Sequence, residues 1–182
     1  LSGVWDHSNF RTDLVGRLRR TTHFVAGTSY ASRAEAERLV ARVRRIHDKV
    51  QGLTEGGAPY SANDPALLTW VHVTEAFGFL QGYRRFAGPV PASDADRYYD
   101  ESRVVAEMLG ARDVPRTEAE VAAYFERVRS ELAFTGRSRA VLEVLATMSL
   151  PTPMPRLSRQ GFLGAGAPLL ADWSRAIGGR GQ

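Results

Sequence analysis

Asp64-Pro65-Ala66-Leu67-Leu68-Thr69-Trp70-Val71-His72 opens a segment in which apolar side chains recur to about residue 87. Aspartate is a favoured N-cap and proline is favoured at the first helical position, so a helix is predicted to begin here. The apolar residues lie nearly all round this helix, which is typical of a helix in the centre of a fold. We therefore predict a central buried helix over residues 64–87.

Start signals for further helices recur along the chain, and no strand alternation of useful length accompanies them. Ser32 with Glu35 and Thr117 with Glu120 form capping boxes, while Ser93 and Ser138 are good N-caps. The expected helices cover residues 11–30 (interrupted near Gly27), 32–50 (ended by Gly52), 93–109, 117–133 and 138–149. These signals predict an all-α, single-domain bundle of about six or seven helices around the central one.

The 182 residues fit one domain, and 43% hydrophobic with 24% charged residues is ordinary for a globular protein. We expect a helical domain over residues 1–150 and a Pro/Gly-rich C-terminal extension over residues 151–182 with one short helix. No apolar run reaches the ~18 residues of a membrane helix, and no signal peptide is visible. A cytoplasmic protein without a membrane span is therefore expected. Since the chain begins at Leu1, we also expect it to be a fragment or N-terminally truncated.

Composition excludes several classes of site. There is no cysteine, so disulfides, zinc–thiolate sites, iron–sulfur clusters and a thiolate-ligated haem are excluded. The net charge of +4 is spread along the chain, whereas nucleic-acid-binding proteins more often concentrate basic residues on one face or tail. We predict no nucleic-acid partner.

Two of the four histidines, His47 and His72, fall on expected helices, His47 at the edge of an apolar stripe. Imidazole is the commonest metal ligand in proteins. Arg17, Arg20 and Thr21 share one face of the first long helix, because residues three and four apart are neighbours on a helix. Arginine suits carboxylates such as porphyrin propionates. Taken alone, these residues also fit a core histidine and a solvated basic face.

Three blocks carry a resemblance: Arg-x-x-Arg-Thr at 17–21, His-x-x-Val-x-Gly at 47–52, and Tyr-x-Ala-x-Asp-Pro at 60–65 followed by Trp-Val-His at 70–72. From about Val4 to about Pro115 the chain resembles the catalytic domain of the family of rubber oxygenase (latex-clearing protein) and the mycophenolic acid pathway oxygenase, formerly a domain of unknown function. The resemblance implies an all-helical fold holding haem b.

The same resemblance implies roles for single residues. His47 stands where the family has the axial iron ligand, and His72 is the second candidate for contact with the cofactor. Arg17 would bind a haem propionate, and Arg20 and Thr21 would line the side where dioxygen binds and act in catalysis. The rubber oxygenases have lysine where this chain has Arg20, and their upstream glutamate has no clear counterpart here, which argues against rubber as the substrate.

Two functions remain open at this point. The first is a haem b-dependent oxygenase that acts on a hydrophobic small molecule with dioxygen. The alternative is a non-catalytic helical domain that binds a lipophilic ligand or a protein partner without a metal. The sequence does not indicate the oligomeric state.

Overall fold

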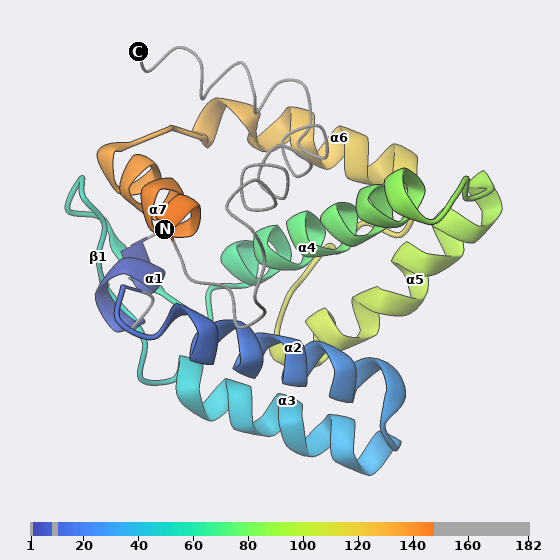
Figure 1. The fold of residues 1–182 in the computed structure, drawn as a ribbon, viewed down its shortest axis with the longest axis horizontal. Helices are drawn as coiled ribbons and strands as arrows, with labels where there is room; N and C mark the ends of the chain where they lie inside the picture. Colours follow the sequence, from blue (N-terminus) through green and yellow to red (C-terminus); the bar gives the residue numbers. More distant parts are fainter. Residues whose placement is uncertain (1, 9–10, 148–182) are drawn as a thin grey trace.

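The structure, a computed structural model, describes residues 2–8 and 11–147. This part of the chain is built almost entirely of helices, joined in one place by a short hairpin (Figure 1). The elements are α1 (Ser2–His7), α2 (Leu14–Tyr30), α3 (Arg33–His47), β1 (Gln51–Leu53), β2 (Pro59–Ser61), α4 (Pro65–Phe86), α5 (Ala92–Leu109), α6 (Glu118–Val128), the 3-10 turn η1 (Arg129–Glu131) and α7 (Gly136–Thr147). The predicted all-α fold class is confirmed. The short helix expected within residues 151–182 lies outside the described residues.

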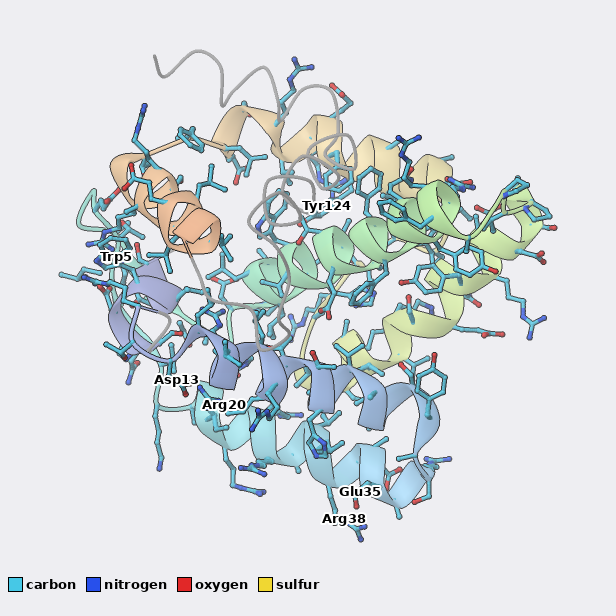
Figure 2. All side chains as sticks on the ribbon, viewed as in Figure 1. Trp5, Asp13, Arg20, Glu35, Arg38 and Tyr124 are labelled. Carbon is cyan, nitrogen blue, oxygen red and sulfur yellow. The ribbon has the colours of Figure 1, made fainter. Side chains whose placement is uncertain are left out.

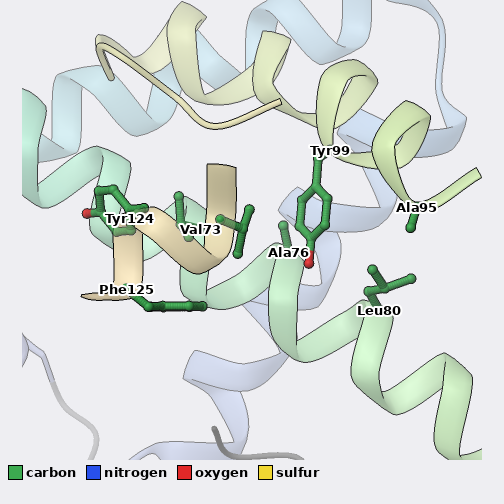
Figure 3. Packing of buried hydrophobic residues seen from close by; sticks show 8 residues of the cluster. Val73, Ala76, Leu80, Ala95, Tyr99, Tyr124 and Phe125 are labelled. Carbon is green, nitrogen blue, oxygen red and sulfur yellow. The ribbon is translucent and has the colours of Figure 1, made fainter. Parts of the chain in front are cut away.

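Helix α4 begins as the sequence predicts and lies in the middle of the fold (Figure 1). The Asp64 carboxylate accepts hydrogen bonds from the backbone N–H groups of Ala66 and Leu67, with Pro65 in the first turn. α5 and α6 pack on α4 to form the main core (Figure 3). Its buried members are Val73, Ala76 and Leu80 of α4, Ala95 and Tyr99 of α5, and Val121, Tyr124 and Phe125 of α6.

α2 and α3 form an antiparallel helical pair that turns at Ala31 and Ser32 (Figure 1). Ser32 caps α3 by accepting a hydrogen bond from the Glu35 N–H, as predicted. α2 runs through Gly27 without a break, so the interruption expected there is wrong. A Cβ at Gly27 would lie 2.3 Å from Cδ1 of Leu39. Gly27 therefore allows α2 to approach the buried Leu39 closely.

The expected end of α3 needs correction, and a β hairpin that was not predicted follows this helix. α3 ends at His47 rather than near residue 50, and Gly52 lies in β1 opposite Tyr60 instead of capping the helix. Each strand has only three residues, too few for an alternating pattern to be recognised. β1 and β2 pair antiparallel, with Gln51 opposite Ser61. The hairpin thus lies in a segment for which no strand was predicted.

Three other helix ends differ from expectation by a few residues, as is common for helix termini. α5 begins at Ala92 with Pro91 as its N-cap and no capping side chain, so Ser93 is not the cap. α6 ends at Val128 and continues as η1. α7 begins at Gly136, where Thr135 and Ser138 hydrogen-bond each other.

Glycine substitutions test the close contact of α2 with α3. A Cβ added at Gly78 on α4 would meet no neighbouring atom within 4 Å, so Gly78→Ala should raise the unfolding free energy by up to ~1 kcal/mol through helix propensity. The change in unfolding free energy for Gly27→Ala should be at least ~1 kcal/mol less favourable than for Gly78→Ala, because Leu39 has to shift. Urea unfolding measures both variants. Equal effects at the two sites would contradict the close packing at Gly27.

Candidate functional site

His47 ends α3 and turns inward. Its side chain is half-buried, whereas the neighbouring Ile46, which the sequence placed in the buried stripe, is 52% exposed. Nδ1 of His47 is fully buried and has no hydrogen-bond partner among the described residues. Burial lowers the pKa of His47 and outweighs the opposite effect of the Asp48 carboxylate. The imidazole is therefore neutral near pH 7, which is the form that binds metals.

His72 lies half-buried on α4. Burial lowers its pKa, and the nearby Glu107 of α5 opposes that shift. Glu75 follows three residues later, on the same side of the helix. Burial raises the pKa of the Glu75 carboxyl group. α4 therefore carries a neutral imidazole beside a carboxyl group that ionises less readily than a free one.

Arg17 is the inward-facing member of the predicted set on α2. Its side chain is half-buried, and its Nη1 donates a hydrogen bond to Ser8 Oγ at 3.0 Å. Burial, and then the neighbouring charge of Arg20, lower the pKa of Arg17. An anion placed beside this guanidinium would raise the pKa of Arg17 again, because an opposite charge stabilises the charged form.

Arg20 and Thr21 lie at the surface of the described part of the chain. The Arg20 side chain is 62% exposed and pairs with Asp13, its Nη1 lying 3.2 Å from the carboxylate (Figure 2). Asp13 is also the N-cap of α2, since it accepts a hydrogen bond from the Gly16 N–H. Thr21 is exposed. Arg20 and Thr21 are thus exposed, whereas Arg17 is half-buried.

The helical pair brings His47 and Arg17 to one end. His47 is the last residue of α3 and Arg17 lies in the first turn of α2, so the antiparallel arrangement puts both at the same end of the pair (Figure 1). His72 belongs to a different helix, and no hydrogen bond or ion pair within residues 2–8 and 11–147 joins it to either of them. The fold thus puts His47 and Arg17 at one end of the helical pair and His72 on a separate helix.

One face of α4 is apolar and remains uncovered by the described residues. Phe79, Tyr83 and Phe86 are each more than half exposed, and they continue the face of His72 and Glu75 at spacings of three and four. Exposed aromatic groups in a row are typical of a surface that binds something apolar. The central helix is therefore buried on the side of α5 and α6 and open on this one.

Phe77 of α4 packs against the core, unlike Phe79 and Tyr83. Its ring packs edge-on against Phe125, with 5.2 Å between ring centroids. Sequence periodicity does not distinguish these positions, because every face of α4 carries apolar residues.

Sequence reasoning missed two polar residues. Glu75 is an acid within an apolar helix, three residues after His72, and that position was a usable signal. Asn63 lies inside the Tyr-x-Ala-x-Asp-Pro block but carried no signal of its own. Its Nδ2 donates to Asp48 Oδ1 at 2.7 Å, and its Oδ1 is buried without a hydrogen-bond partner.

Comparison with known proteins assigns the family. The sequence model of the family described as "ER-bound oxygenase mpaB/B'/Rubber oxygenase, catalytic domain" matches residues 1–180. The chain belongs to this family. The match covers nearly the whole chain, well beyond the three blocks, and it supports an oxygenase in general. No curated protein and no solved structure matches the chain. None of the described helices is long and apolar enough to cross a membrane.

The residues of this family member fit a haem better than a bare metal ion. Within the described residues, no three His, Asp or Glu side chains gather to hold a metal. A haem iron takes its equatorial ligands from the porphyrin and needs only axial ligands from the protein. The neutral imidazole of His47 would meet that need, and the half-buried guanidinium of Arg17 suits a propionate.

Stability at mildly acidic pH tests the burial of His72. The unfolded imidazole has a pKa near 6.5 and the folded one a lower pKa. Below about pH 6.5 the unfolded state binds more protons, so the unfolding free energy falls as pH falls, by at most ~1.4 kcal/mol per pH unit for one group. His72→Asn should reduce this loss between pH 7.5 and pH 5.5 in urea unfolding. Equal pH profiles for wild type and His72→Asn would contradict the buried neutral imidazole.

Proposed function

We propose that this chain is a haem b-dependent oxygenase domain that acts on a hydrophobic small molecule with dioxygen. Membership of an oxygenase family supports the reaction class. The observation that carries the haem is the half-buried, neutral imidazole of His47 at the same end of the helical pair as Arg17. Haem would supply an iron centre that activates dioxygen, and the protein supplies the ligand, the orientation and an apolar surface.

Each residue has a distinct task in this proposal. His47 would hold the iron, with His72 as the alternative. Arg17 binds a propionate, which satisfies its remaining donors and compensates its burial. Arg20 and Thr21 act on the dioxygen side. Arg20 can turn inward at little cost, because its pair with Asp13 is mostly exposed and such pairs contribute only ~0–1 kcal/mol.

The uncovered face of α4 is the proposed contact for the substrate. Phe79, Tyr83 and Phe86 offer aromatic surface next to His72 and Glu75. Burying apolar area contributes about 25 cal/mol per Å², without directional demands, so this face suits a hydrophobic molecule. The same exposed face also favours the second candidate function, a helical domain that binds a lipophilic ligand or a protein partner without metal.

An absorption spectrum decides between the two functions. We expect the purified protein, as isolated or after haem is added, to show an intense porphyrin band. His47→Ala should lose the haem or change that band grossly, because the axial ligand is removed. A protein that stays colourless after haem is added would support the second function.

Substitution of the other histidine tests the assignment of the ligand. His72→Ala should retain most of the haem, since His72 is not expected to hold the iron. If His72→Ala loses the haem and His47→Ala keeps a wild-type spectrum, the ligand assignment is reversed. If neither substitution affects the spectrum, the proposed haem site is wrong.

Alanine substitutions on α2 separate cofactor binding from catalysis. Arg17→Ala should lower haem occupancy, because a propionate contact stabilises the cofactor in every redox state. Arg20→Ala or Thr21→Ala should keep the haem and slow the reaction of the reduced protein with dioxygen, by ~10²–10³-fold if the donor acts only in the transition state. The exposed Arg19, changed to Ala, is the matched control and should alter neither quantity. Unchanged haem content and oxygen reactivity in all three variants would identify this face as a solvated basic surface.

A further inference from the structure

Two of the buried polar atoms that lack a partner lie at the junction of α3 with the β hairpin. Only three such side-chain atoms occur in the described part of the chain: Nδ1 of His47, Oδ1 of Asn63 and Nη1 of Arg137. Arg137 already faces the carboxylates of Asp6 and Glu55. Leaving a buried polar group without a partner costs about 1–3 kcal/mol, so such atoms need an explanation.

Asp48 fixes the orientation of the Asn63 amide. An ionised carboxylate only accepts hydrogen bonds, so the amide must turn its NH₂ group toward Asp48. The structure has this arrangement, with Nδ2 of Asn63 2.7 Å from Oδ1 of Asp48. Turning the amide over would place oxygen against oxygen. Oδ1 of Asn63 is therefore held on the buried side, where it can act only as an acceptor.

Backbone hydrogen bonds also link the end of α3 at His47 to the segment that contains Asn63. The Val50 N–H donates to the His47 carbonyl at 2.9 Å, and the Ala62 N–H donates to the Val50 carbonyl at 2.8 Å. Asn63 directly follows Ala62, and Asp48 directly follows His47. One link through side chains and one through the backbone thus connect the segment of His47 and Asp48 with the segment of Ala62 and Asn63.

We propose that Asn63 is a positioning residue for His47: its Oδ1 accepts the Nδ1–H hydrogen bond of the imidazole, directly or through one buried water. This bond joins a donor and an acceptor that otherwise both lack partners. It keeps the proton on Nδ1 and leaves Nε2 with its lone pair as the ligating nitrogen. Histidine ligands generally donate their second ring N–H in this way, which fixes the tautomer and the ring orientation and raises ligand basicity.

The iron-ligating part of this inference rests on the proposed haem function, whereas the hydrogen bond itself does not. The first measurement therefore uses the apoprotein. Long-range ¹H–¹⁵N spectra of the uniformly labelled protein at pH 7.5, assigned with His47→Gln, should show His47 as the Nδ1–H tautomer. A predominant Nε2–H tautomer would overturn the proposal.

Three variants distinguish a role of Asn63 Oδ1 as hydrogen-bond acceptor from a merely structural role of this residue. Asn63→Leu removes the amide at similar volume and should shift the His47 ring nitrogens toward a mixture of tautomers. Asp48→Ala frees the NH₂ group, so the amide can turn over, and it should shift the His47 ring nitrogens in the same direction but less than Asn63→Leu does. Asn63→Gln keeps an amide oxygen and should restore part of the wild-type signature. A wild-type tautomer in Asn63→Leu, or a shift in Asn63→Gln as large as in Asn63→Leu, would overturn the proposal.

Haem titration then tests the consequence for the ligand. Asn63→Leu should weaken haem binding about tenfold or more, and it should raise the reduction potential, because an imidazole without its acceptor donates less charge to the iron. Asp48→Ala should change both quantities less. A wild type that binds no haem but has the Nδ1–H tautomer would refute the proposed function and leave the Asn63 hydrogen bond standing. Unchanged binding and potential in Asn63→Leu would refute its role toward the ligand.

Discussion

The burial of one side of α4 beneath α5 and α6 is the constraint on which the rest of the structure depends. Val73, Ala76 and Leu80 lie almost without exposure under Tyr99 and the aromatic rings of α6 (Figure 3). At the far end of α4, Arg84 holds Glu118 of α6 through two hydrogen bonds and lowers the pKa of that carboxyl group. Because α4 is fixed on this side, the exposed face that flanks the core has a defined direction.

The face of α4 that flanks this core carries the polar groups of the helix. His72 and Glu75 stand among exposed aromatic side chains, and burial makes the charged form of each less favourable. Tyr98 of α5 borders the same region; burial and the neighbouring Glu75 raise its pKa to about 12, and its hydroxyl donates to the Ala76 carbonyl. A surface of weakly charged polar groups among aromatic rings suits an apolar ligand better than an ionic one.

The α2–α3 pair buries fewer residues than the core formed by α4, α5 and α6. No described residue of α2 is fully buried, and α3 buries only Leu39 and Val40. Arg17 lies half-buried with a lowered pKa, which is an arrangement that an anionic group would stabilise. A cofactor that binds only the folded state would add stability in proportion to the logarithm of its concentration over Kd, so its binding would be coupled to the folding of this pair.

Local signals in the chain were enough to predict the helices from α2 onward and their approximate ends, because caps, prolines and apolar periodicity act over a few residues; the family came from the resemblance of three short blocks. Asp64 with Pro65 and Ser32 with Glu35 begin their helices through local hydrogen bonds that need no tertiary contact. Tertiary packing selected the buried face of α4, made Gly27 a close contact rather than a break, and turned Arg17 inward while Arg20 pairs with Asp13. It also brought Asn63 to Asp48, fifteen positions earlier in the chain. A helix that is apolar all round contains no local signal for which face will be buried. A residue such as Asn63 contains no local signal for its partner, because the partner depends on how distant elements pack.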